Sequence, residues 1–146
     1  MGFSLEDVQE DILTFIRSST PWTVDETGVP DIDRVPKVNG KIVPYVVVQF
    51  GDIAPNGRRA MSGAFDDDYR LPVYITVIGP TAGVTRKVYN RIILSFLGKT
   101  FDWAGQIRKS AGGGSYSTRS STTGTEAYAF PAAFTLGIQL SETPEP

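Results

Sequence analysis

The stretch from Leu71 to Leu97 restricts the possible folds of this chain more than any other part of the sequence. In its first half, apolar residues at positions 71, 73, 75 and 77 alternate with the residues between them, which is the period of a β-strand. The Gly79-Pro80 pair ends that strand, and Thr81 is a suitable N-cap for a helix. This stretch therefore predicts a strand that leads directly into a helix.

The predicted helix carries apolar side chains on one broad stripe and polar side chains on the opposite side. We expect the stripe to face the core. It comprises Val84, Val88, Tyr89, Ile92, Ile93, Phe96 and Leu97. The opposite side carries the basic residues Arg86, Lys87 and Arg91. Leu94 falls toward this polar side, which makes it a candidate for contact with a partner, and Gly98 is a suitable residue to follow the helix.

A second amphipathic helix is predicted near the N-terminus. Ser4 can cap it, and apolar residues at positions 5, 8, 12, 15 and 16 recur at helical spacing. Pro21 blocks its continuation, so the helix should end near Ser18. Its first turns are acidic, as the helix dipole favours. The acidic residues are Glu6, Asp7, Glu10 and Asp11.

Several other segments have the composition of strands. Residues 44–50 are apolar on both faces, which predicts cover on both sides of that strand. Residues 115–123 are polar and β-prone, so we expect an edge strand or an exposed loop. Residues 127–140 alternate bulky with small side chains, and Pro131 should mark a bulge or an edge position there. Asn39-Gly40 predicts a two-residue hairpin turn.

The segment from 52 to 69 contains little that could enter a core. A possible turn at Asn56-Gly57 and a polar composition suggest an extended loop or hairpin arm. Its charged residues of interest are Arg58, Arg59, Asp66, Asp67 and Asp68.

Taken in order, these elements predict an α+β fold with the sequence α-β-β-α-β-β. We expect one mixed, mainly antiparallel sheet of about four strands, with the helices packed on it. A chain of 146 residues is most simply one domain, spanning residues 1–146, with the arm at about 52–69 as its main extension. No apolar run approaches the roughly 20 residues that a membrane helix needs, so we expect no membrane partner.

The residue composition excludes several kinds of catalytic site. The chain has no histidine and no cysteine, which removes Ser-His-Asp and Cys-His nucleophilic sites and ordinary zinc sites. The three aspartates at 66–68 could hold Mg²⁺, but adjacent carboxylates on a strand point to alternate faces, and a solvated acidic loop is the favoured interpretation. We therefore expect no catalytic residue, no metal and no cofactor.

Charge is distributed unevenly along the chain. Residues 1–33 contain eight acidic residues and one basic residue, whereas residues 34–99 contain ten basic and four acidic residues. One interpretation is that the charges serve solubility, as most charged surfaces do. The other is a heterologous contact, in which the acidic part of one copy meets the basic part of the next. The net charge of −2 argues against a general nucleic-acid binder.

In its order of elements, the chain resembles the tail terminator proteins of siphoviruses, the long-tailed phages. The resemblance rests on an acidic opening helix, the strand PYVVVQFGD, a loop with glycine and arginine, and an aromatic-rich final strand. The most characteristic piece is YRLPVYITVIGPT leading into VTRKVYNRIILSFLG. It is a resemblance of pattern that covers most of the chain.

The resemblance implies a structural virion protein that forms a homo-hexameric ring. Such a ring sits on the last ring of the major tail-tube protein, stops tube polymerisation and presents a surface to head–tail connector proteins. DNA passes through its lumen without specific binding. The implied location is the head-proximal end of the tail in the virion, after synthesis in the host cytoplasm.

The resemblance also gives the charged residues possible roles. In the arm, Arg58, Arg59, Asp66, Asp67 and Asp68 would contact the tube or line the lumen, where acidic side chains would repel phosphate. The candidate subunit interface comprises Arg86, Lys87, Arg91, Leu94, Glu6, Asp7, Glu10 and Asp11. Alternatives are another head–tail connector or tail-tube subunit and, less favoured, a small enzyme or ligand-binding domain that uses Asp and Glu.

Overall fold

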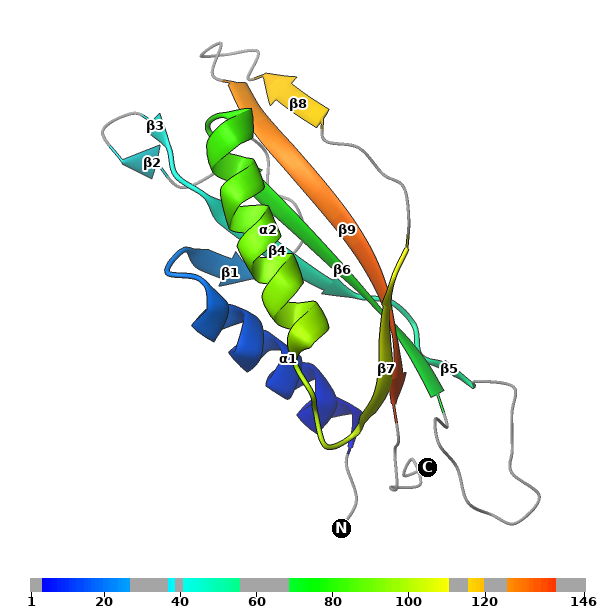
Figure 1. Cartoon of the computed structure of the whole chain (residues 1–146). Coiled ribbons are helices and arrows are strands. Elements are labelled where there is room, and N and C mark those ends of the chain that lie inside the picture. Colours follow the sequence, from blue (N-terminus) through cyan, green and yellow to red (C-terminus); the bar gives the residue numbers. More distant parts are fainter. Residues whose placement is uncertain are drawn as a thin grey trace, which may run out of the picture.

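Two helices pack on one face of a β-sheet in the computed structural model, which describes residues 4–26, 37–38, 41–55, 69–110, 116–119 and 126–138 (Figure 1). The helices are α1 (Leu5–Ser19) and α2 (Ala82–Gly98). The longer strands are β4 (Tyr45–Phe50), β6 (Tyr69–Gly79), β7 (Ala104–Lys109) and β9 (Glu126–Ile138). The shorter strands are β1 (Thr23–Asp25), β2 (Lys37–Val38), β3 (Lys41–Ile42), β5 (Ala54–Pro55) and β8 (Tyr116–Arg119).

The main sheet follows the order β1-β4-β6-β9-β7, with β5 paired to β6 and β8 paired to β9. β1 runs parallel to β4, and the other pairs of this sheet are antiparallel. β2 and β3 form a separate two-stranded sheet, in which Val38 pairs with Lys41 across the predicted Asn39-Gly40 turn. The α+β fold class is therefore confirmed. The expected number of about four strands was too low, because β1 and β5 are too short to show a period in the sequence. β8 lies within residues 115–123, where an edge strand or an exposed loop was expected.

Both helices begin at the predicted caps. Ser4 Oγ accepts a hydrogen bond from the Asp7 backbone N–H at 3.1 Å, and Thr81 Oγ1 accepts one from the Val84 N–H at 3.2 Å. These bonds satisfy backbone donors that the first helical turn leaves without a partner. The predicted ends were also close, since α1 ends at Ser19 and α2 at Gly98.

The main core lies between the two helices and the sheet. From α1 it takes Val8, Ile12, Leu13 and Ile16, and from α2 it takes Ile92, Ile93 and Phe96. The predicted stripe on α2 was wrong at both ends, because Val84 and Leu97 are 41% and 40% exposed. Thr85 is instead fully buried. It lies at the centre of the stripe and beside Gly79, where an added Cβ would meet the Thr85 side chain.

The strand at 44–50 is buried on both faces, as its composition predicted. Val46 and Val48 belong to the main core, whereas Tyr45 and Val47 belong to a second cluster on the face away from the helices. This second cluster also contains Ile42, Ile78, Ala127 and Ala129. The sheet therefore has a helix-covered face along its length and a smaller apolar cluster near one end of the opposite face.

Pro131 occupies a local edge within the central strand β9. β7 and β8 pair with β9 on either side of residues 130–132, and no described strand pairs with those residues on that flank. The Ser110 N–H donates to the Ala133 carbonyl at 2.9 Å, so the backbone groups of odd-numbered residues here point away from β6. An N–H at position 131 would point to the same flank, away from β6. The lack of this N–H in proline therefore removes no hydrogen bond between β9 and β6.

Pro72 holds the equivalent position in β6. On the flank opposite β9, β4 pairs with residues 73–78 of β6, and β5 pairs with Tyr69 and Arg70. Pro72 lies between these two paired stretches. The Pro72 carbonyl accepts a hydrogen bond from the Gly51 N–H at 2.9 Å, so the missing N–H of Pro72 also faces this flank. As a result, β6 and β9 pair without interruption from Tyr69 to Gly79.

The base of the predicted arm is a short antiparallel pair. Ala54 pairs with Arg70 and Pro55 with Tyr69, so the chain leaves and re-enters the sheet side by side at this point. The arm residues Arg58, Arg59, Asp66, Asp67 and Asp68 lie outside the described residues. In the part of the chain that the structure describes, no helix is long and apolar enough to span a bilayer.

Candidate functional site

The outward face of α2 combines positive charge with an exposed leucine. Arg86, Lys87 and Arg91 are all exposed, and their side chains form no hydrogen bond or ion pair with another described residue. Leu94 is 70% exposed, the largest exposure among the large hydrophobic residues that the structure describes. It lies opposite the buried residues Ile92 and Phe96 on the helix circumference. A single exposed leucine is common on protein surfaces, so what distinguishes this one is the group of exposed basic residues around it.

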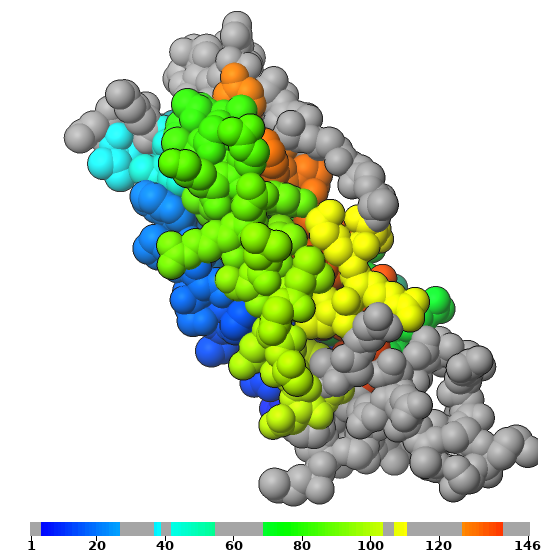
Figure 2. Space-filling view, in the orientation of Figure 1, coloured from blue at the N-terminus to red at the C-terminus, as the bar shows by residue number. Residues whose placement is uncertain are grey.

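The outward face of α1 is acidic. Glu6, Asp7 and Glu10 are exposed, and no ion pair within the described residues neutralises them. Asp11 is also exposed, but its Oδ2 accepts a hydrogen bond from the Trp103 indole N–H at 2.9 Å. The predicted interface residues therefore form two groups of opposite charge, one on each helix. Figure 2 shows that both helices lie side by side on the same outer surface.

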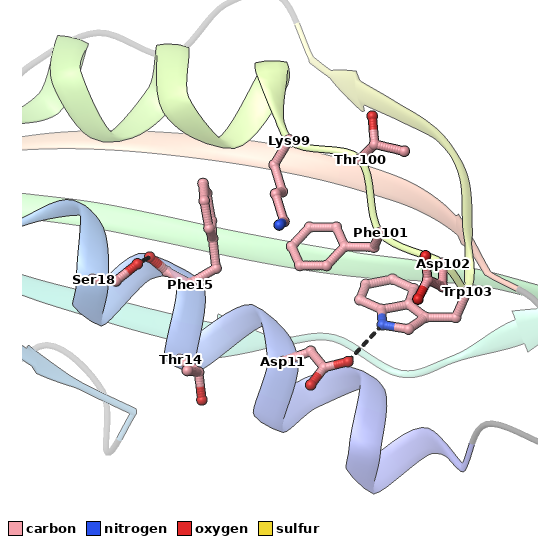
Figure 3. Close-up of a pocket in the computed structure, with 9 residues that line it drawn as sticks. All are labelled: Asp11, Thr14, Phe15, Ser18, Lys99, Thr100, Phe101, Asp102 and Trp103. Atoms are coloured by element: carbon pink, nitrogen blue, oxygen red, sulfur yellow. Dashed lines mark hydrogen bonds between the residues drawn. The ribbon is translucent and has the colours of Figure 1, made fainter.

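A cleft of about 390 Å³ lies between α1 and the segment that connects α2 to β7 (Figure 3). From α1 it is lined by Asp11, Thr14, Phe15 and Ser18, and from the connecting segment by Lys99, Thr100, Phe101, Asp102 and Trp103. Of the predicted interface residues, only Asp11 belongs to this cleft.

Aromatic rings form the base of the cleft. Phe101 and Trp103 stack with their ring centroids 4.6 Å apart, and Phe15 meets Phe101 edge to face at 5.8 Å. Lys99 Nζ lies 5.5 Å from the centroids of both the Phe15 and Phe101 rings, a cation–π arrangement. Phe101 and Trp103 are buried, so packing within the molecule holds these rings in place.

Charge is divided between the two ends of the cleft. In Figure 3, Lys99 extends toward the gap between Phe15 and Phe101, whereas Asp11 and Asp102 lie on either side of Trp103. The cleft can therefore accept an apolar side chain against its rings and a cation at its acidic end. Asp11 was predicted from the sequence as an interface residue, but the cleft was not predicted. The only sequence signal is the alternation of Phe101 and Trp103, which is equally typical of a strand leading back to the sheet.

A second polar contact lies on the face of the sheet away from the helices. The Tyr45 hydroxyl donates to Asp25 Oδ2 at 2.8 Å and so connects β4 to the short strand β1. Burial raises the pKa of Tyr45 to about 12, and the hydrogen bond and the negative charge of Asp25 add to the increase. This contact fastens an edge strand and offers no reactive group at neutral pH.

Among the described residues, no three acidic side chains are grouped so that they could hold a metal ion. The Asp66–Asp68 run, the one metal site considered from the sequence, lies outside those residues. No protein-family model matches the chain, and comparison with curated proteins gives no match either.

Proposed function

We propose that this protein is a structural component of a long-tailed phage, which forms a ring that caps the tail tube, stops its polymerisation and joins the tail to the head connector. Its partners are other copies of itself in a homo-hexamer, the major tail-tube protein and head–tail connector proteins. It acts in the virion without catalysis, and DNA passes through the ring without specific binding.

One observation carries the proposal: a single sheet scaffold exposes a basic helix face and an acidic helix face, and neither is neutralised by ion pairs within the described residues. A ring needs two different complementary surfaces on each subunit, because the contact between neighbours is head-to-tail. Opposite charges on the two surfaces favour that pairing and disfavour the pairing of like surfaces. The similarity of the element order to tail terminator proteins supports the same function.

The proposal is tested by removing the gene from a phage genome that carries it. Without a terminator, tube polymerisation should continue, so electron microscopy should show overlong tails that lack heads. Tails of normal length that join heads would reject the proposal. Counting copies in the virion separates a terminator from a tail-tube subunit, because one closed ring predicts a few copies per particle and a tube subunit predicts dozens.

The charged surfaces are tested by reversing one exposed charge at a time. Arg91→Glu on the outer face of α2 should reduce assembly and leave the thermal unfolding midpoint unchanged. Arg70→Glu is the matched control, because Arg70 is also exposed but its register places it on the face of the sheet away from the helices. Equal effects of the two variants on assembly would contradict a specific role for the α2 face.

A further inference from the structure

We infer that the cleft between α1 and the α2–β7 segment receives Leu94 from a second copy of this chain. The inference deepens the proposed function, and it rests on that function for the partner being another copy. It adds a specific contact, with an apolar side chain on one subunit and an aromatic cleft on the next.

Leu94 has the properties of an interface anchor. It is 70% exposed on a helix whose opposite face is buried in the core through Ile92 and Phe96. Arg91 and Lys87 lie on the same side of the helix, one and two turns before it respectively. The helix therefore presents a leucine with positive charge on its N-terminal side.

The cleft complements this pattern. Aromatic rings lie at its base, because the half-buried Phe15 ring packs edge to face on Phe101, which in turn stacks on Trp103. Its volume of about 390 Å³ leaves room for a leucine side chain, since a cavity of roughly 150 Å³ already holds benzene. The site is thus built before any partner arrives, so little ordering entropy opposes docking.

The charges at the ends of the cleft fix the direction of docking. Asp11 and Asp102 flank Trp103, whereas Lys99 lies over Phe15 and Phe101 at the other end. A leucine that enters the cleft with its basic neighbours toward Trp103 brings Arg91 and Lys87 near the two aspartates and keeps them away from Lys99. The opposite direction would place like charges together, which is unfavourable.

The occupant must come from another molecule. Leu94 lies on the side of α2 opposite its buried residues, whereas the cleft lies between α1 and the segment that follows α2. A rigid helix whose other face is buried cannot turn its leucine into a cleft beside its own C-terminal end. A second copy supplies both halves of the contact, with the charge complementarity described above.

Cysteine cross-linking tests the contact directly, because the chain has no cysteine of its own. A Leu94→Cys variant mixed with a Thr14→Cys variant should form a disulfide between the two chains under mild oxidation, since Thr14 lines the cleft. Arg70→Cys mixed with Thr14→Cys is the control, because Arg70 lies on the opposite face of the sheet. Equal yields of cross-linked product in the two mixtures, up to the highest soluble concentration, would overturn the inference.

Two further variants test the chemistry of the contact. Leu94→Ala should weaken self-association roughly tenfold or more, since burying a leucine contributes more than the 1.4 kcal/mol that corresponds to a tenfold change in affinity. Arg91→Glu should reduce the cross-linking yield, and combining it with Asp102→Lys on the Thr14→Cys chain should restore it. A yield that does not depend on these charges would overturn the predicted direction of docking.

Failure of this inference is distinguishable from failure of the proposed function. Specific cross-linking together with tails of normal length after gene removal would keep the contact and reject the phage function. Overlong tails together with no specific cross-link would keep the function and reject the contact. A chain carrying both cysteines adds a second distinction: covalent oligomers longer than a dimer support a head-to-tail ring, and closed dimers alone contradict it.

Discussion

Gly79 and Thr85 lie in direct contact where β6 gives way to α2. A Cβ added to Gly79 would contact Thr85 Oγ1 and would lie 3.3 Å from the Thr85 Cβ atom. Thr85 cannot easily move away, because it is fully buried and its hydroxyl donates to the Thr81 carbonyl at 2.6 Å. The absence of a side chain at position 79 is therefore what allows the strand and the helix to approach this closely.

We predict that Gly79→Ala lowers the free energy of unfolding by about 2 kcal/mol, because the new methyl group overpacks a buried contact. Urea denaturation followed by circular dichroism measures the change. Gly83→Ala is the matched control: Gly83 lies in α2 with no atom within 4 Å of its added Cβ, so alanine should stabilise the helix by about 0.5 kcal/mol or more. A Gly79→Ala variant as stable as the parent would contradict the close packing.

The position of Pro131 in β9 leads to a second prediction. Pro131→Ala should change the unfolding free energy by less than about 1 kcal/mol, because the backbone nitrogen of residue 131 faces the flank of β9 between β7 and β8, where no described strand pairs with it. Ala132→Pro should destabilise the protein by about 2 kcal/mol or more, because the nitrogen of residue 132 faces β6 and its hydrogen bond would be lost. Similar losses from the two changes would show that Pro131 is not at a local edge.

The order of the long elements could be predicted from the sequence because it depends on local periodicity. The alternation in 71–78 and the helical spacing after Thr81 each reflect which side of an element faces the core. The short strands could not be predicted in this way. β5 has only two residues, and it forms because the chain beyond Phe50 passes beside the start of β6.

The same distinction applies to the candidate site: the features set by a single helix could be predicted from the sequence, and those set by tertiary packing could not. The exposed charges of α1 and α2 could be assigned from a helical projection, because exposure on a helix follows from position alone. The cleft could not be predicted, because it depends on how two distant segments meet. Asp11 and Trp103 are 92 residues apart in the chain, and their hydrogen bond forms because α1 lies beside the segment that leads into β7. Val84 and Leu97 were misplaced because they lie at the two margins of the stripe on the helix circumference, farthest from the buried residues at its centre.

The pKa of Tyr45 predicts how stability changes at high pH. The pKa is about 12 in the folded state and about 10 in an unfolded chain, so the unfolded state loses its proton first. The contribution of Tyr45 to the free energy of unfolding is therefore fully present below pH ~10 and is lost as the pH rises from about 10 to 12. Urea midpoints measured across this range should fall more steeply for the parent than for Tyr45→Phe, which has no proton to lose. Parallel curves for the two proteins would contradict the assignment.

The hydrogen bond between Trp103 and Asp11 should contribute about 1 kcal/mol to stability, since it links a buried indole to a carboxylate on an exposed helix face. A double-mutant cycle isolates this contribution, because Trp103→Phe also changes ring packing and Asp11→Ala also changes the charge of α1. In Asp11→Asn the side-chain oxygen can still accept the indole proton, so this variant should lose less stability than Asp11→Ala. Since the bond holds α1 against the entry to β7, its loss should also speed amide hydrogen exchange in the first turns of α1. A coupling energy near zero, with unchanged exchange in α1, would show that aromatic packing alone holds the cleft together.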